Sequence, residues 1–267
     1  VSDSPVATHT FFGPGHLVAT VTATAEDGRT DTEAVGITVV HPLAATPPRF
    51  ASTIAQSNGL AYAVMRDFDL VAVVDLASKT VIEHLDTCGH PTTLSVADDV
   101  LAIACTDDAL DLFDVSASPT IEHIRTVETP RASAPFGVVV AEGAAWLTFQ
   151  GTGQVAAIDI ESGLPEIQPV GTDLRGIAWD GTDIWVTQHR SPDDGGVVSR
   201  LTDGGVDTFT LAMAPGPDSD TDARGVPTYL QQIAIGPDGK AAFIVGLNAN
   251  IERGLFRDGQ TPTHETT

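Results

Sequence analysis

LAYAVMRDFDLVAVVDLASKT, residues 60–80, contains the pattern that decides the fold: an apolar strand, a polar turn, and an alternating strand that ends in Asp before a Ser-containing turn. The same plan returns in VLAIACTDDALDLFDVSASPT (100–120) and AAWLTFQGTGQVAAIDIESGLP (144–165). A fourth copy, residues 183–205, keeps the strands but has Arg200 at the position of the aspartate. Short strands that recur about every 40 to 45 residues are typical of propeller blades.

Each copy is preceded by one more apolar strand and a turn, as in PTTLSVADD, PFGVVVAEG, LRGIAWDGT and LQQIAIGPDG. A blade cannot bury both faces alone, so several must stack around an axis. The sequence therefore predicts an all-β fold, an incomplete β-propeller of about four to five four-stranded blades. A large β-sandwich, the alternative, would not give such self-similarity. We expect the blades at about residues 50–90, 91–133, 134–174 and 175–229, with a partial one at 230–267.

These repeats resemble the YVTN family of β-propellers. The matching segments are GPDGKAAFIV (236–245), LVAVVDLAS (70–78) and QVAAIDIESG (154–163). The resemblance implies a propeller from about residue 50 to 246, in a family whose members serve as binding scaffolds, surface proteins and enzyme modules alike. We expect the aspartates that end the alternating strands, Asp75, Asp114 and Asp159, to accept hydrogen bonds from turn amides rather than to act in catalysis.

The N-terminal stretch HTFFGPGHLVATVTATAEDGRTDTEAVGITVV (9–40) does not fit the blade pattern. It shows two alternating strands around a D-G turn. It resembles the C-terminal half of a PKD-type Ig-like domain, and the matching positions are His9, Thr10, Phe11, Pro14, Gly15, Val21, Asp27 and Gly28. The earlier W-x-F-G-D-G strand of that family is absent.

We therefore predict a partial Ig-like β-sandwich at 1–41, a Pro-rich linker at 42–49 and the propeller at 50–267. Pro42, Pro47 and Pro48 favour extended backbone in the linker. We also expect the chain to be truncated at both ends.

The charge is strongly acidic: 13 Lys and Arg face 36 Asp and Glu, for a net charge of −23. Such a surface repels nucleic acid and anionic membranes, because phosphate binding needs clustered cations. No run of about 18 apolar residues is present, so we expect no membrane insertion.

Cys88 and Cys105 flank one predicted strand–turn–strand unit, so they could form a disulfide on neighbouring strands or remain as two buried thiols. We favour the disulfide, because the other signs indicate export to an oxidising environment. Neither cysteine belongs to a C-x-x-C or C-x-x-C-H motif, so redox chemistry and covalent haem attachment are unsupported.

Four polar residues are candidates for the lining of the central channel, where propellers commonly place ligands. His90 and Arg175 lie near the start of predicted innermost strands, as does Gln232, and His189 follows the second strand of its blade. Single histidines are more often surface or packing residues than ligands, and both interpretations stay open.

The segment PGPDSDTDARG (215–225) is a candidate calcium site, since Asp218, Asp220 and Asp222 alternate and their carboxylates could converge on the ion. The EF-hand pattern fails further on, because Ala223 replaces the turn glycine and Tyr229 the bidentate glutamate. A solvated acidic loop is the favoured alternative. Calcium is the only cofactor that the sequence suggests.

The favoured functional hypothesis is a non-catalytic, exported bacterial module that binds protein or glycan or acts as a scaffold. We expect it outside the cell, in the periplasm or at the cell surface. One alternative is an accessory propeller of a longer exported redox protein, similar to di-haem peroxidases. Another is a lactonase-like, metal-dependent propeller hydrolase, although the Glu, Asn and Asp ligand set of such enzymes is not evident. No G-x-S-x-G or phosphate-binding glycine loop occurs.

Overall fold

A computed structural model describes residues 8–10, 15–39, 52–216, 224–236, 239–249, 256–258 and 261–263. The chain divides into two compact units, Val1–Thr46 and Pro47–Thr267. Among the described residues, no helix is both long enough and apolar enough to cross a membrane.

The first unit contains a β-hairpin of β1 (Gly15–Thr24) and β2 (Thr30–Val39), paired antiparallel in continuous register from Gly15↔Val39 to Thr24↔Thr30. Its turn has Gly28 at φ +81°, which glycine adopts without a steric penalty, and Asp27 accepts a hydrogen bond from the Arg29 N–H. The two strands and the D-G turn agree with the sequence pattern. The Ig-like assignment of this unit stays a prediction.

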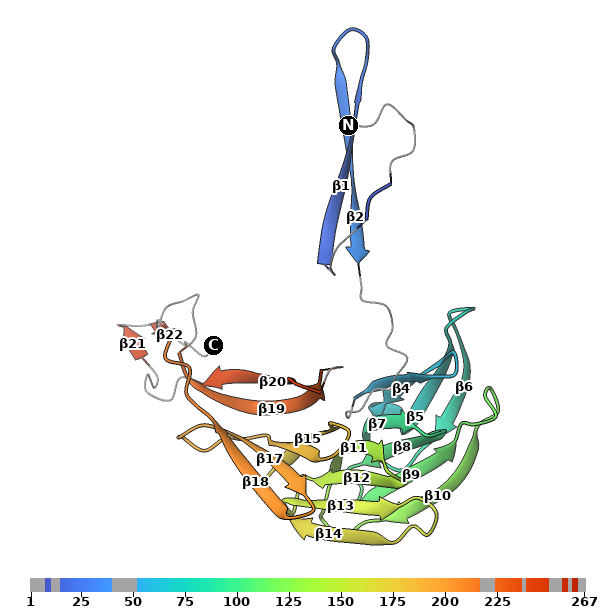
Figure 1. The fold of residues 1–267 in the computed structure, drawn as a ribbon, viewed down its shortest axis with the longest axis vertical. Coiled ribbons are helices and arrows are strands. Elements are labelled where there is room, and N and C mark those ends of the chain that lie inside the picture. The colour runs from blue at the N-terminus through green and yellow to red at the C-terminus, as the bar shows by residue number, and fades with distance from the viewer. Residues whose placement is uncertain are drawn as a thin grey trace. The chain divides into compact units, whose positions relative to one another are not determined.

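The second unit is an incomplete β-propeller of four-stranded antiparallel sheets (Figure 1). In each sheet the strands follow one another in chain order, as in a propeller blade. Blade 1 consists of β3 (Ile54–Ser57), β4 (Leu60–Met65), β5 (Leu70–Asp75) and β6 (Thr80–Asp86), with a 3-10 turn η1 (Arg66–Phe68) between β4 and β5. Blade 2 consists of β7 (Pro91–Ala97), β8 (Val100–Cys105), β9 (Ala109–Asp114) and β10 (Glu122–Glu128).

The remaining sheets continue the series around the arc (Figure 1). Blade 3 consists of β11 (Pro135–Ala141), β12 (Ala144–Phe149), β13 (Gln154–Asp159) and β14 (Pro165–Pro169). Blade 4 consists of β15 (Leu174–Trp179), β16 (Ile184–Gln188), β17 (Gly196–Thr202) and β18 (Gly205–Leu211). Blade 5 shows β19 (Val226–Ile235) and β20 (Ala242–Ala249), and a further hairpin pairs β21 (Phe256–Asp258) with β22 (Thr261–Thr263).

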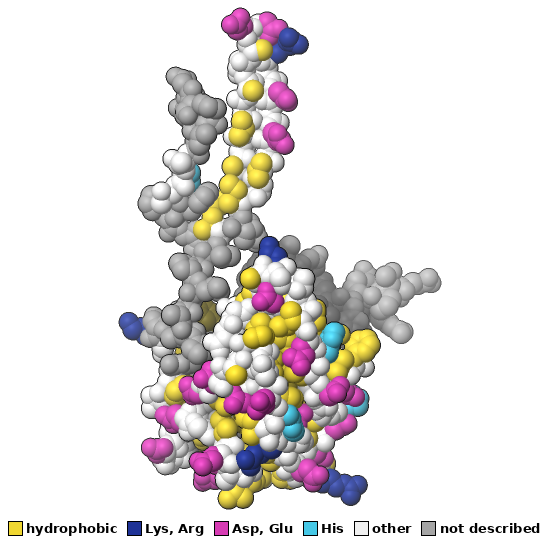
Figure 2. All heavy atoms as spheres, turned by 90° about the vertical axis from the view of Figure 1, so that its right-hand side faces the viewer, with side chains coloured by type: hydrophobic (Ala, Val, Ile, Leu, Met, Phe, Trp, Pro, Cys, Tyr) yellow, Lys and Arg dark blue, Asp and Glu magenta, His cyan; other side chains and the backbone are white. Residues whose placement is uncertain are grey.

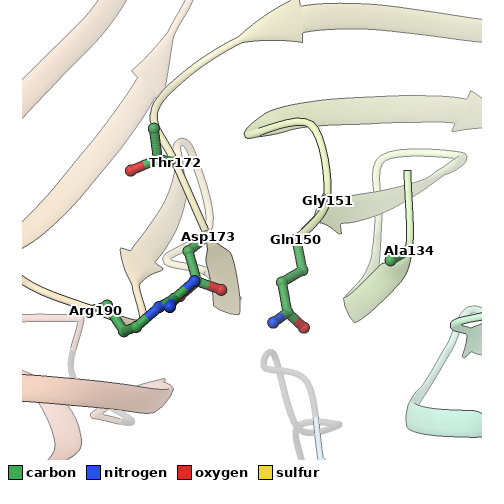
Figure 3. Close-up of a pocket in the computed structure, with 6 residues that line it drawn as sticks. All are labelled: Ala134, Gln150, Gly151, Thr172, Asp173 and Arg190. Atoms are coloured by element: carbon green, nitrogen blue, oxygen red, sulfur yellow. The ribbon is translucent and has the colours of Figure 1, made fainter. Parts of the chain in front are cut away.

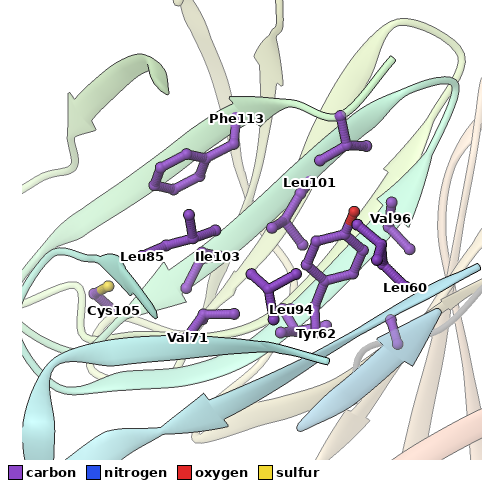
Figure 4. Packing of buried hydrophobic residues seen from close by; sticks show 13 residues of the cluster. Leu60, Tyr62, Val71, Leu85, Leu94, Val96, Leu101, Ile103, Cys105 and Phe113 are labelled. Atoms are coloured by element: carbon purple, nitrogen blue, oxygen red, sulfur yellow. The ribbon is translucent and has the colours of Figure 1, made fainter. Parts of the chain in front are cut away.

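The hydrophobic core lies between successive blades, because each sheet is apolar on both faces. Between blades 1 and 2, Tyr62 from β4 packs with Leu94, Leu101, Ile103 and Phe113 from blade 2 (Figure 4). Equivalent clusters join blade 2 to blade 3, blade 3 to blade 4 and blade 4 to blade 5. Stacking of this kind explains why the repeat, rather than a single blade, is the unit of stability.

Buried threonine hydroxyls connect the inner strands of neighbouring blades. Thr148 Oγ1 on β12 accepts a hydrogen bond from the Gly137 N–H (2.9 Å) and donates one to the Arg175 carbonyl of the next blade (2.9 Å). Thr187 makes the equivalent pair of bonds one blade further on. These bonds tie β12 to β11 and β15, and β16 to β15 and β19.

The aspartates that end the third strands act in turns, as the sequence predicts. Asp75 Oδ1 accepts a hydrogen bond from the Ser78 N–H (2.6 Å), and Asp159 Oδ1 accepts bonds from the N–H (2.7 Å) and hydroxyl (2.5 Å) of Ser162. These bonds hold the pKa of both carboxyl groups below the usual range, and the equivalent Asp114 behaves in the same way.

Blade 4 replaces this turn with a charged pair. Arg200 Nη2 lies 2.6 Å from Asp207 Oδ2 on the neighbouring strand. Its guanidinium carbon also lies 5.6 Å from the ring centroid of Trp185 and 5.9 Å from that of Phe209. Arg200 therefore stabilises the pairing of β17 with its neighbouring strands through a salt bridge and ring contacts, where the other blades use a turn carboxylate.

Cys88 and Cys105 form a disulfide that ties the segment leading into β7 to the end of β8. Cys105 is fully buried in the core between blades 1 and 2, and the half-buried Cys88 packs against the same cluster. The bond therefore anchors the entry of blade 2 to that core.

Candidate ligand-binding face

The same unusual backbone conformation occurs in blades 2 to 5, either immediately before the inner strand or within it. His90, Ala134, Asp173 and Tyr229 have φ values of 55°, 46°, 48° and 50°, in the left-handed region that non-glycine residues seldom adopt. His90, Ala134 and Asp173 stand immediately before β7, β11 and β15, and Tyr229 stands at a register shift within β19. We call the surface formed by the loops around these four residues the entry face.

A cavity of about 630 Å³ opens on the entry face over blades 3 and 4 (Figure 3). Figure 3 shows Asp173 and Arg190 together on one side and the Gln150 side chain projecting from the other. The loops that contribute lead into β11 and β15 or join the second and third strands of the two blades. The lining residues are Ala134, Gln150, Gly151, Thr172, Asp173 and Arg190.

A fixed ion pair forms one wall of this cavity. Arg190 Nε donates a hydrogen bond to Asp173 Oδ2 at 2.7 Å, and the Asp173 side chain is only 11% exposed. Burial alone would raise the pKa of Asp173, but the hydrogen bond and charge of Arg190, aided by the Gln150 side chain, lower it below its usual range. Asp173 in turn raises the pKa of Arg190. Both groups are therefore charged at neutral pH.

Arg175 lies on β15, two residues beyond Asp173. Its Nη1 donates a hydrogen bond to Gln231 Oε1 on β19 (2.8 Å), and its guanidinium carbon lies 4.6 Å from the ring centroid of Phe136 on β11. Its Nε is buried and has no hydrogen-bond partner among the described residues. Burial, followed by the charges of Arg190 and Arg66, lowers the pKa of Arg175 below its usual value, while the charge of Asp173 opposes that shift.

His189 is almost fully buried, at 8% exposure, and its ring centroid lies 5.1 Å from that of Tyr229. Its Nδ1 is enclosed and has no hydrogen-bond partner within the described part of the chain. Burial lowers the pKa of His189, and the nearby positive charge of Arg175 lowers it further. The imidazole is therefore neutral at neutral pH.

Of the four channel candidates, Arg175 and His189 lie close enough for the charge of Arg175 to lower the pKa of His189. The other two, His90 and Gln232, make separate contacts. His90 is on the entry face of blade 2, where its Nδ1 lies 3.1 Å from Asp107 Oδ2 and both side chains are about 58% exposed. Gln232 pairs with Val245 on β20, whereas the preceding residue, Gln231, makes the contact to Arg175.

The calcium candidates Asp218, Asp220 and Asp222 lie outside the described residues. Within the described ranges, no group of three or more His, Cys, Asp and Glu side chains could hold a metal ion. Calcium binding at 215–225 therefore stays a prediction.

Several residues of this face were not identified from the sequence. Asp173 stands before LRGIAW as His90 stands before PTTLSVA, so a comparison of the blade entries could have found it. Gln150, Phe136 and Arg190 carry no pattern of their own. They can be recognised as residues of this face only from the structure, in which the loops of blades 3 and 4 lie side by side.

Comparison with known proteins supports the fold. No family model matches the chain, and no curated protein matches it. The designed protein Ika8 has 10% sequence identity and a TM-score of 0.51, over 85% of this chain and 80% of that one. A functionally unknown protein from Desulfotomaculum acetoxidans has 11% identity and a TM-score of 0.50, over 72% and 76%.

Hydrazine synthase from Kuenenia stuttgartiensis has 21% identity and a TM-score of 0.48, and the match covers 70% of this chain and 58% of the synthase chain. At these identities the likeness concerns the fold alone. The chain thus has an all-β, propeller-like fold of four-stranded antiparallel sheets.

Proposed function

We propose that this chain is a non-catalytic binding or scaffold module that works outside the cell or at its surface and takes a protein or glycan ligand on the entry face. The observation that carries the proposal is the cavity of about 630 Å³ with its fixed Asp173–Arg190 pair and the Gln150 amide opposite. A concave site with a few positioned donors and acceptors is the usual form of a binding site.

The chemistry of the site favours binding over catalysis. Asp173 is held ionised by Arg190, and its lowered pKa makes it a weak general base at neutral pH. The neutral His189 is enclosed against the ring of Tyr229, and its Nδ1 has no hydrogen-bond partner among the described residues. The hydrolase alternative requires converging metal ligands, and the described residues offer no such group.

Two further observations support an exported location and a partner that is neither nucleic acid nor membrane. The Cys88–Cys105 disulfide is the kind of bond that persists in oxidising compartments. Acidic side chains are spread over the surface, as on the side shown in Figure 2, and the net charge is −23. Such a surface disfavours phosphate-rich partners.

The proposal can be tested by screening the full chain, with its disulfide intact, against glycan and extracellular-protein arrays. Ligands should be retained by the wild type, lost with Gln150→Ala, and kept by Thr208→Val, a control on the exposed outer strand β18. Binding that is indifferent to Gln150→Ala and to Arg190→Ala would contradict the entry face as the ligand site. Turnover of lactone substrates by the wild type would favour the hydrolase instead.

A further inference from the structure

The arginines of the entry face stand out in a chain that has 36 acidic residues and only 13 Lys and Arg. Arg175 is half-buried, yet its hydrogen bond goes to an amide and its guanidinium lies over an aromatic ring. The salt bridges of the described residues include neither Arg175 nor Arg66. Asp173, whose negative charge acts on Arg175, is already paired with Arg190.

Arg66 belongs to the same face although it comes from blade 1. It opens the η1 turn between β4 and β5, and Asp69 just after that turn accepts a hydrogen bond from the His90 N–H at 2.7 Å. The turn is thereby joined to the entry of blade 2. The Arg66 side chain is exposed, and its charge is felt at Arg175 in blade 4. Arg66 and Arg175, which form no salt bridge within the described part of the chain, therefore act on the same region.

The cavity beside them offers groups for neutral hydroxyls. The Gln150 amide and the Thr172 hydroxyl can each donate and accept, Asp173 accepts, and Arg190 donates. A sugar hydroxyl is both a donor and an acceptor, so this mixture suits a saccharide ring. Ala134 and Asp173 on the cavity wall lie two residues before Phe136 and Arg175, so the stacked Phe136–Arg175 pair belongs to the two strands that begin at that wall.

We propose that the entry face binds a saccharide that carries a single carboxylate, with Arg175, aided by Arg66, pairing with the carboxylate while Gln150 and the Asp173–Arg190 pair bind hydroxyl groups. This proposal rests on the binding function proposed above. A guanidinium recognises a carboxylate through parallel charge-assisted hydrogen bonds. The ligand carries one charge rather than many, because the net charge of −23 repels polyanions at longer range.

Isothermal titration of the full chain tests this inference with three probes: methyl β-D-glucuronoside, methyl β-D-glucoside, and N-acetylglutamate as a carboxylate without a sugar ring. We expect the glucuronoside to bind about tenfold or more tightly than either of the others. Arg175→Met should remove the preference over the glucoside, and Gln150→Ala should weaken both sugars. Tighter binding of N-acetylglutamate would assign the site to acidic amino acids and overturn the saccharide.

Two further variants distinguish a loss of ligand binding from a loss of folding. Arg66→Gln changes an exposed side chain and should reduce the preference for the acid several-fold without a change in the melting temperature. Lys79→Asn is the charge-matched control, since Lys79 lies in the β5–β6 turn at the other end of blade 1, and it should leave all affinities unchanged.

Equal affinity for the two sugars, a preference that survives both arginine variants, or no binding of any probe would overturn the inference. The proposed function has a separate outcome. It stands if an array ligand of any charge depends on Gln150, and it fails only if no ligand depends on the entry face.

Discussion

The hydroxyl of Thr148 offers the sharpest test of how the propeller holds its inner strands in place. Replacing Thr148 with Val keeps the shape and the β-branching of the side chain but removes the oxygen that links Gly137 to Arg175. Thr148 is fully buried, so no solvent replaces the lost partner. The Gly137 N–H and the Arg175 carbonyl then lack the bonds that the hydroxyl provided.

The expected cost follows from these two groups. A buried donor or acceptor without a partner costs about 1–3 kcal/mol, so the variant should lose about 2–4 kcal/mol of folding free energy after partial relaxation. For a domain of this size, about 2–4 °C of melting temperature is lost per kcal/mol. We therefore expect the melting temperature to fall by about 5–15 °C.

Differential scanning calorimetry of the full chain can measure this change. Thr148→Ser retains the hydroxyl and should lose less than the Val variant, because only a methyl group is removed. Thr208→Val on the exposed strand β18 is the matched control and should stay within about 0.5 kcal/mol of the wild type. A melting temperature for Thr148→Val within about 1 °C of the wild type would refute the role given to the hydroxyl.

Three more predictions concern the disulfide, a blade turn and the buried histidine. Replacing both Cys88 and Cys105 with Ala should lower stability to denaturant by about 3 kcal/mol, and equal midpoints for the oxidised wild type and the variant would contradict this. Asp159→Asn should weaken the Ser162 turn. Because the folded pKa lies below 3.8, the advantage of the wild type in melting temperature should be complete above about pH 4 and lost as the pH falls through that folded pKa; a gap that persists at pH 2 would argue against it. The pKa of His189 is lowered from 6.5 by burial, so the unfolded state binds the proton first, and stability should fall as the pH drops below about 6.5 towards the folded pKa; His189→Gln should flatten that profile, and parallel profiles would exclude the effect.

Much of the fold could be predicted, because the features that define a blade are local. The alternation of apolar and polar residues sets which strands face a neighbouring blade, and an Asp before a tight turn marks where the third strand ends. Blade 4 shows the limit of this reasoning. The sequence reveals that Arg200 takes the place of the aspartate, but its pairing with Asp207 on β18 and its contact with Trp185 on β16 depend on the register of the strands on either side of it.

The site was harder to predict, because it depends on register. Gln231 and Gln232 are adjacent, and a strand turns adjacent residues to opposite sides. The register shift between Thr228 and Gln232 decides which of the two reaches Arg175, and no property of the local sequence announces that shift. The same holds for Gln150 and Asp173, which approach one another only because blades 3 and 4 are stacked.

At the start of the inner strands, the backbone angle stays the same from blade to blade while the side chain changes. This explains how a regular repeat can carry a specific site. The left-handed residue recurs at His90, Ala134 and Asp173 directly before the inner strand and at Tyr229 within it, so the repeat uses the same backbone angle in four successive blades. It does not require its side chain, because an imidazole, a methyl group, a carboxylate and a phenol all occupy the position. The stabilising work is done by buried threonine hydroxyls and by turn aspartates elsewhere in the blade. The side chains at these positions are therefore free to differ between blades. We expect the residues that select the ligand at positions of this kind, where the backbone conformation repeats but the amino acid does not.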